Sequence, residues 1–211
     1  MKSVLVTGGT IRLGAAIAAR LEADGWRVIT SSHRVDAGAD IVQDLSEDLG
    51  AAKLFMRATE LLDGKVPDAL VNNAALFTGE AKTIRAVGLD APRKLTMMMA
   101  GRETGLGAVV NILDATMAKA TTNAAKEYLE AKRELKAFTL SSAMMFAATL
   151  RVNAVAPGPI LPPTEVHEPA GERLLARRPT SEDVAAAVAY LLAAESTTGT
   201  IIPVDGGSHL L

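Results

Sequence analysis

The chain contains no cysteine among its 211 residues. Without thiols, the protein can form neither disulfide bonds nor a thiolate metal site or nucleophile. Its three histidines, His33, His167 and His209, have no spacing that suits a metal ion. We therefore expect no metal site, and we look for the chemistry of this chain in other side chains.

An excess of charge and long apolar runs are missing as well. The net charge is only −2, so we expect no nucleic-acid partner and no anionic membrane surface. No run of about 18 apolar residues indicates a membrane span. Met1-Lys2-Ser3 passes directly into a predicted strand and leaves no room for a signal peptide, which indicates a cytoplasmic location. The length predicts one domain over residues 1–211.

A glycine-rich turn near the N-terminus joins a short apolar strand (4–6) to an alanine-rich helix (15–21). Glycines let the backbone approach a ligand closely, and a helix N-terminus offers free N–H groups to a phosphate. The spacing is T-G-x-x-x-R-x-G instead of G-x-G-x-x-G. We expect this turn to contact a dinucleotide, and the alternative is a tight turn without a ligand. The predicted contacts are Gly8, Thr10, Arg12 and Leu13, with Arg12 where a glycine is usual.

Two further loops follow predicted strands on the nucleotide side. After the strand 27–30, the loop carries His33 and Arg34 in place of the acidic residue that selects NAD. Both are donors that suit a 2′-phosphate, so the loop predicts NADPH; the alternative is an exposed loop arginine without a role. After the strand 41–44, Asp44 and Leu45 are placed to contact adenine, with the carboxylate accepting from the amino group.

The rest of the chain alternates between short apolar strands and amphipathic helices, which predicts an α/β fold with a parallel sheet. Ser46 and Ser181 are predicted helix caps, Pro92 is a predicted kink, and the proline-rich residues 161–178 are a predicted lid. The further strands are 68–75 with its loop, 108–113, 151–155 and 199–204, and the helices are 46–62, 80–100, 122–148 and 184–192.

Polar and aromatic residues follow the fourth strand. Asn72 and Asn73 are poor core residues, and their side chains can brace the loop without touching a ligand. Phe77 follows at the carboxyl end of the strand, where ligands bind. Its ring suits either a ligand or cover for the core, and the sequence leaves both interpretations open.

The strongest chemical signal is Tyr128-Leu129-Glu130-Ala131-Lys132 within a predicted helix. The i, i+4 spacing places Tyr128 and Lys132 on one face, where an ammonium lowers the pKa of the phenol. A tyrosine so placed can donate a proton near neutral pH. This spacing alone also occurs on many exposed helices. Asp114 at the end of the preceding strand strengthens the prediction that these three residues are catalytic.

Taken together, the chain resembles the short-chain dehydrogenases/reductases over nearly its whole length. The motifs are Thr7-Gly8 to Gly14, Asp44-Leu45, Asn72-Asn73-Ala74, Tyr128 to Lys132, Arg151-Val152-Asn153 with Pro157-Gly158, and Val204-Asp205-Gly206-Gly207. The resemblance implies a Rossmann-like, doubly wound three-layer α/β/α sandwich with a mainly parallel seven-stranded sheet, NAD(P)(H), and a homotetramer or homodimer. It also implies cofactor contacts from Asn72, Ala74, Tyr128, Lys132, Pro157, Gly158 and Ile160.

Within that family, the chain is similar to the pteridine reductases and the dihydromonapterin (dihydrofolate) reductases. The features are Arg12, His33-Arg34, Asp114 where most members have serine, and Phe77 where an aromatic stacks the pterin. An ionised carboxylate opposes the oxyanion of ketone reduction but can help deliver a proton to a ring nitrogen. We therefore expect an NADPH-dependent reductase of a dihydropteridine, dihydromonapterin or dihydrofolate, with substrate contacts from Arg12, Phe77, Asp114 and Tyr128.

Two alternatives remain at this point. One is a reductase of a ketone or a 3-oxoacyl substrate, and the other is an NADPH-binding sensor or scaffold without turnover. The alternative of a sensor or scaffold rests on positions where the chain departs from the family pattern. Gly88 stands where the family has a helix asparagine, Ala75 stands where pteridine reductases have serine, and the pocket loops are short.

Overall fold

A computed structural model describes residues 1–103, 105–118, 125–160 and 173–211. Seven parallel strands form one sheet in the order β3-β2-β1-β4-β5-β6-β7. This confirms the predicted fold class, with a sheet that is parallel throughout. The strands are β1 (Ser3–Thr7), β2 (Arg27–Ser32), β3 (Ile41–Val42), β4 (Ala69–Asn72), β5 (Gly107–Ile112), β6 (Leu150–Pro157) and β7 (Ile201–Val204).

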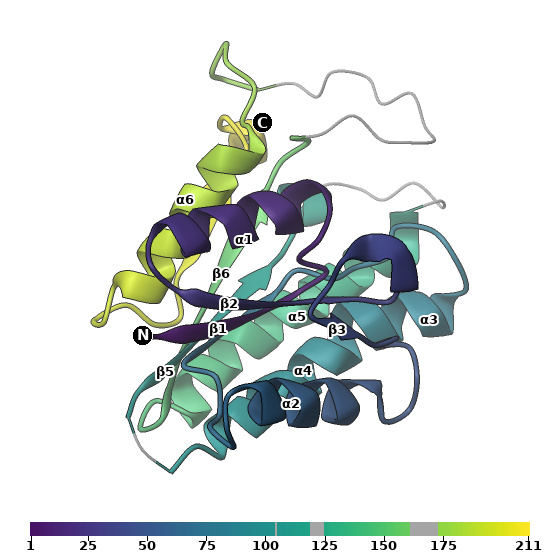
Figure 1. Cartoon of the computed structure of the whole chain (residues 1–211). Coiled ribbons are helices and arrows are strands. Elements are labelled where there is room, and N and C mark those ends of the chain that lie inside the picture. Colours follow the sequence, from purple (N-terminus) through teal and green to yellow (C-terminus); the bar gives the residue numbers. More distant parts are fainter. Residues whose placement is uncertain (104, 119–124, 161–172) are drawn as a thin grey trace.

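Helices cover both faces of the sheet (Figure 1). One face packs against α1 (Arg12–Ala23) and α6 (Ser181–Ala193), which meet Val4, Val71 and Val110. The opposite face packs against α2 (Gly50–Leu61), α4 (Ala91–Ala100) and α5 (Lys126–Met145). Because both faces are buried, the central strands are mainly apolar, as is typical of parallel sheets. This arrangement places the carboxyl ends of the strands along one edge, where α/β folds bind ligands.

Two predicted helix caps are wrong. Ser46 does not begin α2, because its N–H and hydroxyl both donate to Asp44 and the helix starts later, at Gly50. Thr180, not Ser181, is the N-cap of α6. The hydroxyl of Thr180 accepts from the backbone N–H of Asp183, whose carboxylate accepts in return from the N–H of Thr180. This reciprocal pair selects Thr180 over its neighbour.

The predicted helix 80–100 is interrupted. It divides into α3 (Ala81–Arg85), a π-helical turn (Ala86–Asp90) and α4. The predicted kink at Pro92 is wrong by a few residues, since Pro92 stands in the first turn of α4, where proline is tolerated, and the irregular turn precedes it. Gly88 is the centre of that turn. Residues 119–124 and 161–172, which hold the start of the predicted helix 122–148 and most of the predicted lid, lie outside the described residues.

Arg151 and Asn153, part of the sequence resemblance, have structural roles. The buried guanidinium of Arg151 donates to the carbonyl oxygens of Leu191 and Leu192 at the end of α6, at 2.8 Å each. The side chain of Asn153 bonds the backbone of Thr197 and Thr200. The Arg151 contacts satisfy carbonyls that a helix end leaves open. Among the described residues, none of the helices is long and apolar enough to cross a membrane.

Candidate active site

The glycine-rich turn between β1 and α1 is shaped by close backbone approach. Gly8 has a φ of +63°, and a Cβ at Gly14 would lie 1.9 Å from the carbonyl oxygen of Gly8. Arg12, at the start of α1, has a φ of +51°. Such left-handed conformations favour glycine, which explains why a glycine is usual at the position of Arg12. Arg12 therefore holds a strained backbone conformation at the N-terminus of α1.

Asn73 braces the turn. Its side-chain amide donates to the carbonyl oxygens of Thr7 and Gly8, both at 3.0 Å. The hydroxyl of Thr7 in turn accepts from the backbone N–H groups of Asn73 and Ala74, again at 3.0 Å. The bracing role weighed for the paired asparagines is therefore confirmed for Asn73. These bonds lock the end of β4 onto the end of β1.

Asn72 behaves differently from its neighbour. Its side chain is buried and donates to Asn111 at 2.8 Å, and Asn111 donates to Thr139 on α5 at 2.9 Å. This chain of amides joins β4, β5 and α5 beneath the site. The side chain of Asn72 lies in the core instead of lining the cavity described next, so its contact with a cofactor remains only a prediction.

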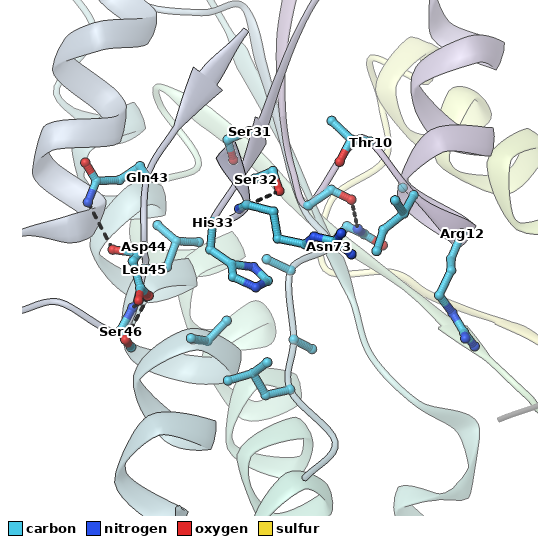
Figure 2. A pocket seen from close by; sticks show the side chains of 18 of the residues that line it. Thr10, Arg12, Ser31, Ser32, His33, Gln43, Asp44, Leu45, Ser46 and Asn73 are labelled. Atoms are coloured by element: carbon cyan, nitrogen blue, oxygen red, sulfur yellow. Dashed lines mark hydrogen bonds between the residues drawn. The ribbon is translucent and has the colours of Figure 1, made fainter. Parts of the chain in front are cut away.

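A cavity of about 350 Å³ lies along the carboxyl ends of β1, β2, β3 and β4 (Figure 2). That volume is within the range of small-molecule sites. It brings together nine of the predicted cofactor residues: Gly8, Thr10, Arg12, Leu13, His33, Arg34, Asp44, Leu45 and Ala74. Sequence reasoning missed Ile11, Gly14, Ser31, Ser32, Gln43, Ser46, Ala75, Leu76, Thr83 and Val87 as lining residues. Ser31 and Ser32 stand at the end of β2, and that position could have predicted them as lining residues. No sequence signal indicates that Thr83 and Val87 line the cavity.

The loop after β2 presents its basic residues at this cavity. His33 lies in the middle of the view in Figure 2, between Asp44 on one side and Arg12 on the other. Arg34 pairs with Asp36 through two contacts, of 3.2 and 3.0 Å. Asp36 raises the pKa of the Arg34 guanidinium, and Arg34 lowers the pKa of Asp36. Both side chains are exposed, so the pair is weak and easily exchanged for another anion.

Asp44 is fixed at the end of β3. One of its carboxylate oxygens accepts from the backbone N–H and the hydroxyl of Ser46, at 2.8 Å each. These bonds lower the pKa of Asp44, with a smaller contribution from the nearby His33. Asp44 is therefore an ionised acceptor at the cavity wall.

Tyr128, Asp114 and Lys132 are brought together at the ends of β5 and α5. The hydroxyl of Tyr128 donates to Oδ2 of Asp114 at 3.0 Å. Nζ of Lys132 donates to the carbonyl oxygen of Ile112 at 2.7 Å and lies 5.5 Å from the centre of the Tyr128 ring. Lys132 is only 2% exposed, and burial lowers its pKa to about 8 despite the opposing charge of Asp114. The three side chains form one unit at this edge of the sheet.

Phe77 extends this unit toward solvent. Its ring meets the ring of Tyr128 edge to face, with centres 5.1 Å apart. Phe77 is 46% exposed, so the interpretation that it covers the core is wrong. An exposed aromatic beside the tyrosine can receive a flat ring.

The remaining predicted contacts lie after β6. Pro157 ends β6, and the N–H of Gly158 donates to the carbonyl oxygen of Val204 at 3.0 Å. A Cβ at Gly158 would approach the side chain of Asp205 to 2.7 Å, so only glycine fits there. Pro157 and Gly158 therefore stand at the same edge of the sheet as Asp114, while Ile160 packs against the α1–α6 face. Within the described part of the chain, no cluster of metal-ligating side chains is found.

Comparisons with known proteins agree with this architecture. A family model described as enoyl-(acyl carrier protein) reductase matches residues 12–209. The granaticin polyketide synthase putative ketoacyl reductase 2 of Streptomyces violaceoruber is 31% identical over 242 residues, covering 98% of this chain and 96% of that protein. The alignment is longer than this chain, so that relative carries insertions.

Solved structures are similar over the same length. The FolM alternative dihydrofolate reductase 1 from Brucella canis, complexed with NADP, has a TM-score of 0.85 and 31% identity over 100% of this chain and 95% of its own. The acetoin dehydrogenase YohF from Salmonella typhimurium has a TM-score of 0.86 and 27% identity over 99% and 96%. Since the family model and these relatives span nearly the whole chain, the protein belongs to the short-chain dehydrogenase/reductase family of NAD(P)-dependent oxidoreductases.

Proposed function

We propose that this protein reduces a C=N bond of a pterin-type ring, such as a dihydropteridine, dihydromonapterin or dihydrofolate, with NADPH. The observation that carries the proposal is the contact between the Tyr128 hydroxyl and the Asp114 carboxylate. A ketone builds negative charge on oxygen as it is reduced, and a carboxylate at that place opposes the charge. A ring nitrogen instead gains a proton, so the same carboxylate is compatible with its reduction.

The cavity suits a phosphorylated dinucleotide. A Cβ at Gly14 would collide with the carbonyl oxygen of Gly8, so glycine keeps the turn tight against the N-terminus of α1, and that terminus favours a pyrophosphate. His33 and Arg34 supply donors for a 2′-phosphate, which supports NADPH over NADH. When bound, NADPH supplies a hydride to the carbon of the C=N bond.

The side chains at β5 and α5 have separate roles in the proposed reaction. Tyr128 gives its hydroxyl proton to the substrate nitrogen. Lys132 stabilises the phenolate that forms and holds the nicotinamide ribose. Asp114 accepts from the tyrosine before substrate binds and from N–H groups of the heterocycle afterwards, while Phe77 stacks on the ring and Arg12 faces its polar edge.

A ketone or 3-oxoacyl substrate is the competing candidate, and the named function of the Streptomyces relative favours it. NADPH binding without turnover is less consistent with the site, because the Tyr128 hydroxyl contacts the Asp114 carboxylate at 3.0 Å and Nζ of Lys132 lies 5.5 Å from the centre of the Tyr128 ring.

The test is NADPH oxidation with dihydrofolate, dihydrobiopterin, a 3-oxoacyl thioester and a panel of ketones. We expect turnover of the pterins, loss of that turnover in Asp114→Ser, and full activity in Tyr190→Phe, which changes an exposed tyrosine on α6. Turnover of ketones alone would contradict the pterin assignment. Tight NADPH binding without turnover of any substrate would identify a sensor.

A further inference from the structure

The carboxylate of Asp114 is held on both of its oxygens. Oδ2 accepts from the Tyr128 hydroxyl, and Oδ1 accepts from Thr116 twice. The backbone N–H of Thr116 lies 2.8 Å from Oδ1, and its hydroxyl lies 2.6 Å from the same atom. A carboxylate rotates easily about its terminal bond, so donors on one oxygen decide where the other points.

Thr116 stands on a segment that is itself tied down. It belongs to the short 3₁₀ helix Ala115–Ala118, directly after β5. Nε of Arg133 on α5 donates to the carbonyl oxygen of Met117 at 2.6 Å. The C-terminal turn Ser208–Leu210 packs against the same segment. The segment that carries Thr116 is thus fixed to the helix that carries Tyr128 and Lys132.

We propose that Thr116 is a positioning residue whose hydroxyl orients the Asp114 carboxylate so that Oδ2 meets the Tyr128 hydroxyl. Thr116 is not among the residues that line the cavity, and it acts through Asp114, whose Oδ1 it holds. The catalytic meaning of this role rests on the proposed function, in which Tyr128 is the proton donor. The geometric role does not depend on which substrate is reduced.

The orientation has a measurable consequence for the acidity of Tyr128. A carboxylate that accepts from a phenol favours the neutral phenol, because the phenolate would stand beside a second negative charge. Lys132 acts in the opposite direction, since its ammonium favours the phenolate. Loosening Asp114 weakens its support of the neutral phenol and therefore lets Tyr128 ionise at lower pH.

The chain is well suited to measure this, because it contains only two tyrosines. In a Tyr190→Phe background, tyrosinate absorbance reports Tyr128 alone and needs neither substrate nor turnover. In that background we expect Asp114→Asn to lower the ionisation midpoint by about one pH unit or more. We expect Thr116→Val, which keeps the shape and removes the hydroxyl, to lower it by about half a unit. Thr116→Ser keeps the hydroxyl and restores the original midpoint.

The double variant Thr116→Val/Asp114→Asn separates positioning from general damage. If Thr116 acts through Asp114, the double variant ionises at the same pH as Asp114→Asn alone. A midpoint unchanged or raised by Thr116→Val, or an equal shift in the presence and absence of the Asp114 carboxylate, would overturn the proposal. Thermal unfolding of each variant gives the stability cost, which a purely structural role would change without moving the midpoint.

Turnover then links the geometry to the reaction. Under the proposed function, Thr116→Val lowers kcat for the pterin substrate about tenfold and leaves its KM and the NADPH affinity nearly unchanged. A shifted tyrosine midpoint without pterin turnover in the parent protein would contradict the proposed function and keep the positioning role. Pterin turnover in the parent protein, with a Tyr128 ionisation midpoint that Thr116→Val leaves unmoved, would support the proposed function and contradict the positioning role.

Discussion

The site has two halves, one shaped mainly by backbone and the other mainly by side chains. At the ends of β1, β2 and β3, the nucleotide half is shaped mainly by backbone, with a left-handed Gly8 and a helix that approaches Gly8 too closely for any side chain at Gly14. At the end of β5 and on α5, the proposed reaction half is shaped by side chains: Thr116 bonds Asp114, Asp114 bonds Tyr128, and Lys132 lies beside the Tyr128 ring.

This difference determines what each half can tolerate. A backbone cradle accepts many side chains that point outward, as the arginine at position 12 shows, but it does not accept one added methyl group at its closest approach. When one side chain of a cluster is replaced, the protein can keep its fold, but the rate of the reaction falls. We therefore expect changes in the reaction half to affect turnover and changes in the nucleotide half to affect affinity.

The largest expected effect is that of Tyr128→Phe. Removing the hydroxyl removes the proton donor while the ring contact with Phe77 remains. We expect kcat to fall about 10²- to 10⁴-fold and the Kd for NADPH to stay within about twofold. Stopped-flow turnover and fluorescence titration measure the two. An equal loss of both would show that the halves are not separable.

Gly14→Ala is the corresponding change in the nucleotide half. Its Cβ would lie 1.9 Å from the carbonyl oxygen of Gly8, so the turn must open. We expect NADPH affinity to fall about a hundredfold or more, since the phosphate would lose aligned N–H groups. Gly101→Ala at the end of α4 is the control, because the nearest atom to its Cβ is 3.4 Å away. Unchanged affinity in Gly14→Ala would place the phosphates elsewhere.

Lys132 gives a pH-dependent test of how the reaction half is held. Its pKa is lowered to about 8 by burial, so the folded state bears the cost of a buried ammonium below that pH. Between pH 8 and the ordinary lysine pKa, the unfolded chain binds more protons than the folded one, so stability rises with pH.

In Lys132→Met this rise is absent. Relative to the variant, wild type should gain about 2 kcal/mol in its free energy of unfolding between pH 7 and pH 10, measured by denaturant titration. A constant difference between the two proteins over this range would show that Lys132 is not charged at neutral pH or is not desolvated.

Arg34→Ala tests the selectivity of the nucleotide half. The 2′-phosphate must replace Asp36 as the partner of Arg34, and the exposed Arg34–Asp36 pair is weak. We expect the ratio of NADPH to NADH affinity to fall about tenfold in Arg34→Ala. It should rise about twofold in Asp36→Asn, which removes the competing anion. A ratio that is unchanged in Arg34→Ala would assign the selectivity to His33 or to another group.

The sequence predicted the fold, and it predicted that Asp114, Tyr128 and Lys132 lie together, because both depend on patterns that are local in the chain. Alternating apolar strands and helices dictate the parallel sheet, and the i, i+4 spacing dictates that Tyr128 and Lys132 share a face. Asp114 at the end of β5 then meets Tyr128 because the next helix, α5, packs back against the sheet beside that strand end. These inferences need no knowledge of distant contacts.

Other features depend on competition between neighbours or on tertiary packing. Ser46 has the right residue type for a helix cap, but its N–H and its hydroxyl both donate to Asp44 instead. Thr180 and Ser181 are both competent caps, and only the position of Asp183 decides between them. Thr83 and Val87 reach the cavity because the chain is interrupted by a π-helical turn, and no sequence period signals that turn.

Gly88 joins the two halves, and its replacement is the subtlest test of their independence. It lies in the π-helical turn whose Val87 lines the cavity and which packs against α5. Among the described residues outside its own helix, the nearest atom to a Cβ at Gly88 would be the Cβ of Ala131, at 3.9 Å, and the φ of Gly88 is not left-handed. Alanine fits there without strain and reduces the entropy of the unfolded chain.

We therefore expect Gly88→Ala to raise the free energy of unfolding by about 0.5–1 kcal/mol and the Tm by about 2 °C. Turnover should be unchanged, because Lys132 is held by the carbonyl of Ile112 and not by residue 88. Gly107→Ala is the matched control that should destabilise, since its Cβ would approach Leu150 to 2.6 Å. A loss of kcat in Gly88→Ala would show that the space beside Ala131 serves the reaction, so that the departure from the family asparagine is functional.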